Sequence, residues 1–149
     1  NVRLRIPNEG LEEFDRINDE FKMHFSSGQG VPDEVDEHYA AIHGQIWAYA
    51  PQNADVIRRQ YLSAGGYKRA AAGGTLSNMN ELLDRSRAID CRTLIVYGYQ
   101  DYEPITQAFL LKDYIRDTTV QFVNESSHFP WIDQGVVFFE LMRNFLCDE

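Results

Sequence analysis

The sequence predicts a mixed α/β protein in which a helical region is followed by a short strand-helix-strand-helix segment. Up to residue 88, apolar residues recur every three or four positions, which is the spacing of amphipathic helices. Continuous apolar runs rich in β-branched residues occur only after that point. A chain of 149 residues that is 44% hydrophobic is long enough to bury a core. We therefore expect residues 1–88 and 89–149 to differ in architecture.

Two longer helices are predicted at the start of the first region. One face of the first carries Leu11, Phe14, Ile17, Phe21 and Phe25, and this helix should end at the flexible stretch 26–30. One face of the second carries Val35, Tyr39, Ile42 and Ile46. The second helix is expected to open at Pro32 and to close at Pro51. The acids of its first turn, Asp33, Glu34, Asp36 and Glu37, suit the positive end of the helix dipole and are interpreted as a helix-start signal.

Weaker signals complete the first region. Asn53 is a suitable N-cap for a helix that runs to Tyr61, and glycine pairs at 65–66 and 73–74 bracket a helical turn. A further helix is predicted from Ser77 to Arg87. The alternation of Val2, Leu4 and Ile6 is the one strand signal before residue 88.

The second region predicts a βαβα unit. The run from Thr93 to Tyr97, ending at Gly98, is typical of a strand covered on both faces of a parallel sheet. A helix over 104–116 and a second strand over 120–123 follow. The terminal helix is expected to bury a stripe formed by Val137, Phe138, Leu141, Met142 and Phe145. A crossover between parallel strands is right-handed in nearly all proteins.

An acid and a histidine follow the two predicted strands. Asp101 lies just after the first strand, and His128 follows the second. Functional groups of such sheets sit beyond the carboxyl ends of the strands, so the two side chains can meet there. A carboxylate that accepts a hydrogen bond from one imidazole nitrogen leaves the other as a general base. The alternative is that Asp101 caps the next helix and His128 packs against Phe129 and Trp131.

Residues 91–147 resemble the C-terminal end of an α/β-hydrolase. The resemblance rests on the apolar strand followed by Gly98-Tyr99-Gln100-Asp101, then 27 positions after the acid the run His128-Phe129-Pro130-Trp131-Ile132-Asp133, and an amphipathic helix. In that family the acid follows the seventh strand and the histidine the eighth. The resemblance implies that Asp101 and His128 are catalytic and that residues 1–88 form a helical lid. The lid length and the His-Phe-Pro-Trp run are most similar to proline iminopeptidases.

The nucleophile of that family has no counterpart in the sequence. A serine hydrolase carries its serine on a G-x-S-x-G elbow, and no such motif occurs here. The loop that would form the oxyanion hole is missing as well. We therefore expect a fragment that lacks the N-terminal half of the fold and is inactive alone. A non-proteolytic lidded hydrolase, such as an esterase or epoxide hydrolase, and a non-catalytic interaction module are the alternatives.

Two further residues are candidates for substrate binding. Glu103 follows Asp101 closely, and in the iminopeptidases that the chain resembles an acid near the catalytic aspartate helps to hold the substrate's amino group. Trp131 could line a pocket, although aromatics at such positions are more often core residues. His38 and His43 are five residues apart, which does not suit a helical metal pair, so packing or solvated roles are favoured. We expect no metal and no organic cofactor.

Composition limits the partners. The net charge of −9 disfavours nucleic acids and anionic membranes. No apolar run reaches the length of a membrane helix, and the first residues lack the apolar centre of a signal peptide, so a cytoplasmic protein is expected. Cys91 and Cys147 show no metal or disulfide spacing. The expected partners are a small-molecule or short-peptide substrate of the complete enzyme and a second copy of the fragment.

Overall fold

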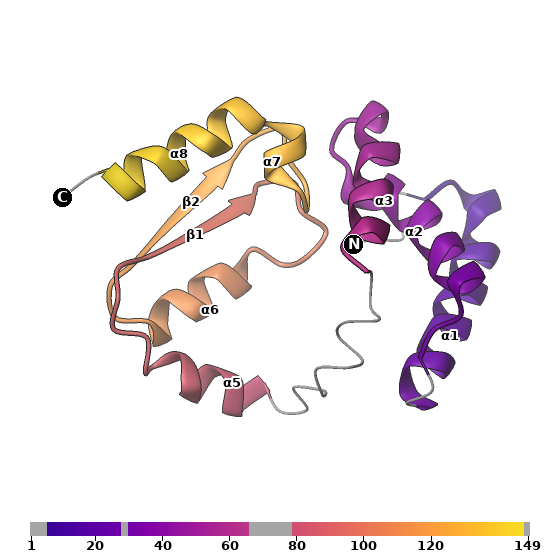
Figure 1. Cartoon of the computed structure of the whole chain (residues 1–149), viewed down its shortest axis with the longest axis horizontal. Helices are drawn as coiled ribbons and strands as arrows, with labels where there is room; N and C mark the ends of the chain where they lie inside the picture. Colours follow the sequence, from indigo (N-terminus) through magenta and orange to yellow (C-terminus); the bar gives the residue numbers. More distant parts are fainter. Residues whose placement is uncertain (1–5, 28–29, 66–78, 148–149) are drawn as a thin grey trace. The chain divides into compact units, whose positions relative to one another are not determined.

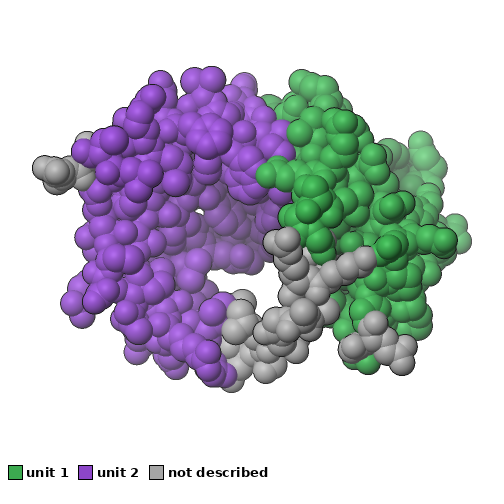
Figure 2. Space-filling view, viewed as in Figure 1, with its two compact units in different colours: residues 1–75 green, residues 76–149 purple. Residues whose placement is uncertain are grey.

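The structure is a computed structural model that describes residues 6–27, 30–65 and 79–147 (Figure 1). It is mostly helical and contains a two-stranded parallel sheet, so the mixed α/β class is confirmed. The chain divides into two compact units, Asn1–Thr75 and Leu76–Glu149 (Figure 2). This division falls before the predicted boundary at residue 88, because helix α5 (Met79–Ser86) packs against helix α6 (Thr106–Tyr114) of the second unit.

The first unit is built from helices, with no strand in its described part. A short 3-10 helix η2 (Asn8–Gly10) leads into α1 (Leu11–Ser27), and α2 (Asp33–Trp47) follows. A second 3-10 helix η3 (Pro51–Asn53) precedes α3 (Ala54–Ser63). The predicted helices over these residues are therefore confirmed. The alternation at Val2 and Leu4 and the predicted turn over 67–72 lie outside the described residues.

The boundaries of α2 differ from the prediction at both ends. Pro32 occupies the N-cap position instead of lying inside the helix, and Asp33, Glu34 and Asp36 fill the first turn. At the other end the backbone becomes extended at Ala48, so the helix stops at Trp47 and not at Pro51. Pro51 instead opens η3, where its missing N–H is not needed.

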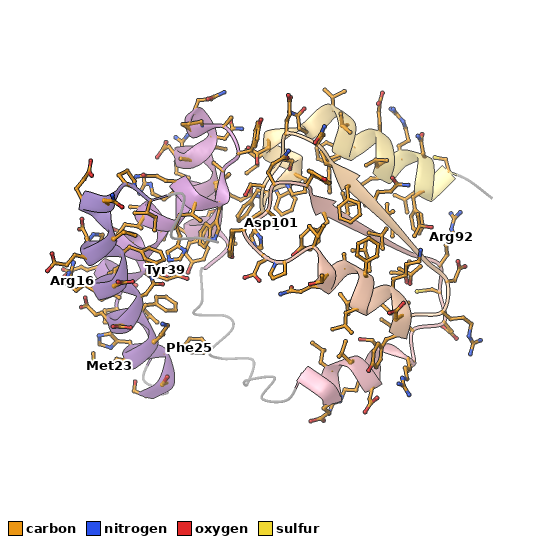
Figure 3. The ribbon with its side chains drawn as sticks, turned by 180° about the vertical axis from the view of Figure 1, so that it is seen from behind. Arg16, Met23, Phe25, Tyr39, Arg92 and Asp101 are labelled. Atoms are coloured by element: carbon orange, nitrogen blue, oxygen red, sulfur yellow. The ribbon has the colours of Figure 1, made fainter. Side chains whose placement is uncertain are left out.

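A cluster of aromatic rings forms the core between α1, α2 and α3. Tyr39 (Figure 3) stacks on Phe21 with centroids 4.1 Å apart and on His43 with centroids 3.9 Å apart. Trp47 approaches His43 and Tyr61 at 5.2 and 5.1 Å. His43 is 7% exposed, and its Nε2 lies 3.1 Å from Asn18 Oδ1. The packing role expected for this histidine is thus observed.

The second unit carries the predicted βαβα order. Strand β1 (Thr93–Gly98) pairs in parallel with β2 (Thr118–Val123), from Thr93 opposite Thr118 to Gly98 opposite Val123. Helix α6 connects the strands, and the short α7 (Pro130–Asp133) leads into α8 (Gly135–Cys147). Within this unit α6 and α8 lie on opposite sides of the sheet (Figure 1). The start of β1 is attached to α8, since the Arg92 guanidinium lies 4.5 Å from the Phe145 ring and donates to the Phe145 carbonyl.

Burial in this unit is lower than predicted. Every β1 residue except Gly98 is only half-buried, although the strand was expected to be covered on both faces. Helix α8 has no fully buried residue, and Val137 of the predicted stripe is exposed. Phe138, Leu141, Met142 and Phe145 are half-buried. The reason is that two strands and their flanking helices offer too few neighbours to enclose either element.

Acid should destabilise the first unit through His43. Burial lowers the pKa of His43 from 6.5 to about 4, so between these values the unfolded chain binds a proton that the folded chain does not. The free energy of unfolding therefore rises with pH across this window and falls on acidification, by about 3 kcal/mol at most. Urea unfolding followed by Trp47 fluorescence in a Trp131→Phe background, at pH 7 and pH 4.5, measures this loss.

His43→Gln should remove most of that pH dependence, because its amide can still donate to Asn18 without titrating. The matched control is His38→Gln on the same helix, where the histidine side chain is 38% exposed. An equal pH dependence in the His43→Gln variant and the unsubstituted chain would show that another group is responsible.

Candidate functional site

The parallel register brings the two strand-end loops together. Both strands end at the same level, with Gly98 opposite Val123. The Tyr99 N–H donates to the Val123 carbonyl at 2.8 Å, which extends the pairing by one step. Asp101 then lies in the loop after β1 (Figure 3), and His128 lies in the loop after β2. Groups that are far apart in sequence thus meet at the carboxyl edge of the sheet.

The Asp101 carboxylate and the His128 ring form the hydrogen bond that the sequence predicts. His128 Nδ1 lies 3.0 Å from Asp101 Oδ2 and 3.2 Å from Oδ1. The Glu103 N–H also donates to Oδ1, at 3.1 Å. The acid side chain is 5% exposed and the histidine side chain 39% exposed. A buried carboxylate is therefore satisfied by donors on two sides while the imidazole reaches solvent.

This geometry fixes the tautomer of the neutral ring. An ionised carboxylate only accepts hydrogen bonds, so the proton of neutral His128 resides on Nδ1. The lone pair is then on Nε2, the form that can accept a proton from a nucleophile. The ring is flanked by Tyr102 at 5.1 Å and Phe129 at 5.4 Å, which restrict its rotation.

Close backbone contact joins the two loops beneath the pair. A Cβ atom on Gly98 would lie 1.9 Å from the Ser127 carbonyl oxygen and 2.7 Å from that of Ser126. Only glycine permits this approach. Ser126 and Ser127 are fully buried, and the Ser127 N–H donates to Asp133 Oδ2 at 3.0 Å. Glu125 adopts a φ of 53°, so the turn after β2 places a non-glycine residue in the left-handed region.

The pKa of Tyr97 is affected by burial and by the carboxylates of the loop. Its pKa is raised to about 12, first by burial and then by the charges of Asp101 and Glu103. The phenol therefore stays neutral, and its hydroxyl donates to the Pro104 carbonyl at 3.4 Å. The carboxylates of Asp101 and Glu103 thus belong to one local electrostatic environment.

The two predicted substrate residues differ in their relation to the pair. Glu103 is half-buried, and its Oε2 accepts a hydrogen bond from Gln107 Nε2 at 3.0 Å. Trp131 packs edge-on against Phe129 at 5.1 Å and near Phe138 at 5.8 Å. Phe129 therefore contacts both Trp131 and the histidine ring, and Trp131 is 36% exposed. Glu103 remains the better placed of the two.

Three residues support the site in ways that the sequence does not reveal: Gly98, Asp133 and Gln100, whose side chain bonds Ser126 and Asn124. The sequence predicts Gly98 only as the end of a strand, although a glycine shortly before the acid is a signal that another backbone segment passes close to it. Asp133 belongs to the family pattern, but the pattern does not predict its hydrogen bond with the Ser127 N–H. Gln100 has no distinguishing signal, since a glutamine in a polar loop is ordinary.

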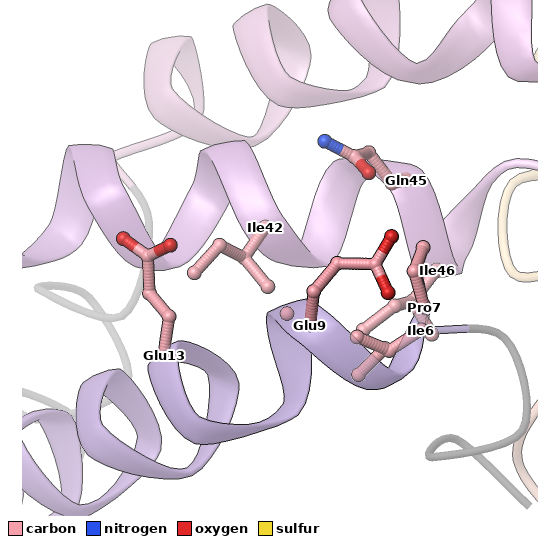
Figure 4. A pocket seen from close by; sticks show the side chains of 8 residues that line it. Ile6, Pro7, Glu9, Glu13, Ile42, Gln45 and Ile46 are labelled. Carbon is pink, nitrogen blue, oxygen red and sulfur yellow. The ribbon is translucent and has the colours of Figure 1, made fainter.

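The first unit has a separate pocket of about 270 Å³ between η2, the start of α1, and α2 (Figure 4). Its floor includes Ile42 and Ile46, and its rim carries Glu9 and Glu13. The Glu13 carboxylate is paired with His38 Nε2 at 2.8 Å. The pocket lining contains no serine, threonine, cysteine or histidine.

Among residues 6–27, 30–65 and 79–147, no three His, Cys, Asp or Glu side chains are grouped to hold a metal ion. None of the helices described there combines the length and apolar character required to cross a membrane.

The site defines an acid–histidine pair at the carboxyl edge of a parallel sheet. Comparison of the chain with models of protein families, with curated proteins and with solved structures finds no match. Function must therefore be argued from the geometry of the pair itself.

Asp101→Asn should reverse the tautomer of neutral His128. The asparagine amide can donate to Nδ1, which then carries a lone pair while Nε2 takes the proton. Long-range proton–nitrogen NMR of the imidazole distinguishes the two forms. In the unsubstituted chain we expect the Nδ1–H form to dominate, and in Asp101→Asn the Nε2–H form.

His38 provides an internal control in the same spectra. It meets Glu13 through Nε2, so its neutral ring should carry the proton on Nε2 in both chains. A dominant Nε2–H form of His128 before substitution would contradict the pairing with Asp101.

Proposed function

We propose that this chain is the lid and C-terminal segment of an α/β-hydrolase and supplies the acid and histidine of a catalytic triad. The observation that carries the proposal is the hydrogen bond from His128 Nδ1 to the buried Asp101 carboxylate. Its position at the carboxyl ends of two parallel strands supports the same conclusion. The helical first unit would contribute the lid.

The proposed chemistry assigns one step to each group. His128 Nε2 accepts the proton of a nucleophile as it attacks the substrate carbonyl, and later returns that proton to the leaving group. Asp101 holds the ring in the required tautomer and stabilises the imidazolium that forms in between. Burial of the carboxylate strengthens this stabilisation, because the surrounding dielectric is low. The nucleophile and the oxyanion donors would come from residues beyond this sequence, which has no G-x-S-x-G motif.

The proposed reaction is the release of an N-terminal residue from a short peptide, of the proline iminopeptidase type. A free amino terminus is cationic, and Glu103, whose backbone N–H donates to the Asp101 carboxylate, would supply a second negative charge to the same loop. After burial, which is the larger cause, the charges of Asp101 and Glu103 both contribute to the raised pKa of Tyr97. An esterase or epoxide hydrolase would need no such charge. Insensitivity of the complete enzyme to blocking of the substrate amino group would favour those alternatives.

The chain alone should not hydrolyse aminoacyl or ester reporters. Two triad members without a nucleophile and oxyanion hole cannot form a covalent intermediate. The measurement is turnover of proline arylamide and of a simple aryl ester by the purified chain, with His128→Ala as control. Turnover that disappears in the His128→Ala variant would overturn the proposal that the nucleophile lies outside this sequence.

The coding sequence upstream of Asn1 tests the proposal at another level. We expect it to encode a strand, a G-x-S-x-G turn and a helix in that order. A long upstream sequence without that motif would favour a non-catalytic interaction module that uses the apolar faces of the helices.

We also propose that the chain associates with a second copy of itself. In the described sheet β1 pairs with β2 alone, so its other edge has no strand neighbour there. Helix α8 exposes Val136, Phe139 and Leu146 by 78%, 61% and 71%. With Arg143 these residues follow a 3-4-3 spacing, so two antiparallel α8 helices would place Val136 against Leu146 and Phe139 against Arg143 of the other copy. The apolar and cation–π pairings are thus self-complementary.

Light scattering should therefore give an average mass above the 17.2 kDa of one chain, increasing with micromolar concentration. Phe139→Lys should lower that mass by removing the ring and repelling Arg143 of the other copy. Met23→Lys, which alters an exposed apolar residue of α1, is the matched control. A strictly monomeric, cooperatively folded chain would contradict the proposal.

A further inference from the structure

The Asp101–His128 pair lies beyond the end of the strand ladder that supports it. Regular pairing stops at Gly98 opposite Val123, and the Tyr99 N–H adds one more bond to β2. The acid and the histidine then lie on two separate loops, beyond the last residues that pair as strands. Their 3.0 Å contact requires that these loops keep a fixed separation. Hydrogen bonds between the two loops must therefore take the place of the strand pairing that ends at Gly98 and Val123.

Gln100 makes hydrogen bonds of this kind. Its N–H donates to the Ser126 carbonyl at 2.9 Å, and its side-chain Oε1 accepts from the Ser126 N–H at 3.1 Å. Its Nε2 donates to Asn124 Oδ1 at 3.3 Å. One residue of the acid loop thus bonds both backbone groups of Ser126 and also the side chain of Asn124. This reproduces the two-sided bonding of a strand pair at a point where the backbone alone no longer supplies it.

The position of Gln100 in the chain couples these bonds to the catalytic pair. Gln100 directly precedes Asp101, and Ser126 lies two residues before His128. Ser126 is fully buried, so its N–H cannot exchange Gln100 for bulk water without movement of the loop. On the far side of the histidine loop, the Ser127 N–H is held by Asp133. Gln100 is therefore the link by which the histidine loop is held to the acid loop.

We propose that Gln100 is a positioning residue that keeps Asp101 within hydrogen-bond distance of His128. The inference rests on the proposed function for its catalytic meaning. Its structural content concerns only the Nδ1–H bond and can be measured without any substrate. In this role Gln100 acts through the Ser126 backbone.

The test is the tautomer of neutral His128 in Gln100→Met, read by long-range proton–nitrogen NMR. Methionine keeps the length of the side chain and removes both hydrogen bonds. We expect the Nε2–H fraction of His128 to rise several-fold, because the Asp101 bond lengthens or breaks. Gln100→Glu should restore the native fraction, since its carboxylate accepts from the Ser126 N–H and the Asn124 amide can turn to donate to it.

Thr118→Val is the matched control for general loss of stability. It removes the bond from Thr118 Oγ1 to the Ile115 carbonyl at the opposite end of β2 and should leave the tautomer unchanged. Should Gln100→Met fail to fold, Gln100→Asn takes its place, because it keeps an amide that is one methylene too short to reach Ser126. A folded Gln100→Met or Gln100→Asn chain with the native tautomer fraction would overturn the inference. So would a failure of Gln100→Glu to restore it.

These outcomes separate the inference from the proposed function. A tautomer shift in Gln100→Met together with an inactive full-length protein would support the positioning role and reject the hydrolase. An active full-length enzyme with an unshifted tautomer in Gln100→Met would support the hydrolase and reject the positioning role of Gln100.

Discussion

The in-register parallel pairing of β1 and β2 determines where every other part of the site lies. It ends both strands at the same level, so the loops that follow begin side by side. A register change of one residue would reverse which side chains face each surface of the sheet and would offset the loop starts by more than 3 Å. The 3.0 Å contact between His128 Nδ1 and Asp101 Oδ2 could not survive that offset. The site therefore depends first on strand register and only then on its own side chains.

The elements and the acid–histidine pair were accessible from the sequence because their causes are local. Helical spacing in α1 and α2 follows from which side chains share a face, and the β-rich run of β1 follows from branched side chains at consecutive positions. The pairing of Asp101 with His128 needed one further rule, that parallel strands place their carboxyl ends together. Each of these inferences uses neighbours in sequence or one topological regularity.

The burial of each strand and the hydrogen bonds between the loops could not be predicted in the same way. Both depend on residues far away in the sequence that the fold brings close. The run from Thr93 to Tyr97 would be buried in a larger sheet, and in the described structure it is half-buried because few elements surround it. Gln100 is an ordinary loop residue until Ser126 is brought to it by the register. Gly98 is an intermediate case, because the sequence predicts it as the end of a strand, while its need to lack a Cβ comes from the Ser127 carbonyl.

The central proposal is that Asp101 and His128 would serve a nucleophile supplied by residues outside this sequence. The most direct measurement is labelling of the full-length gene product with a fluorophosphonate, followed by mass spectrometry of the labelled peptide. The account predicts a modified serine in a segment preceding Asn1, with labelling lost in His128→Gln and strongly slowed in Asp101→Asn. Labelling that is indifferent to both substitutions, or a folded full-length protein that takes no label, would contradict it.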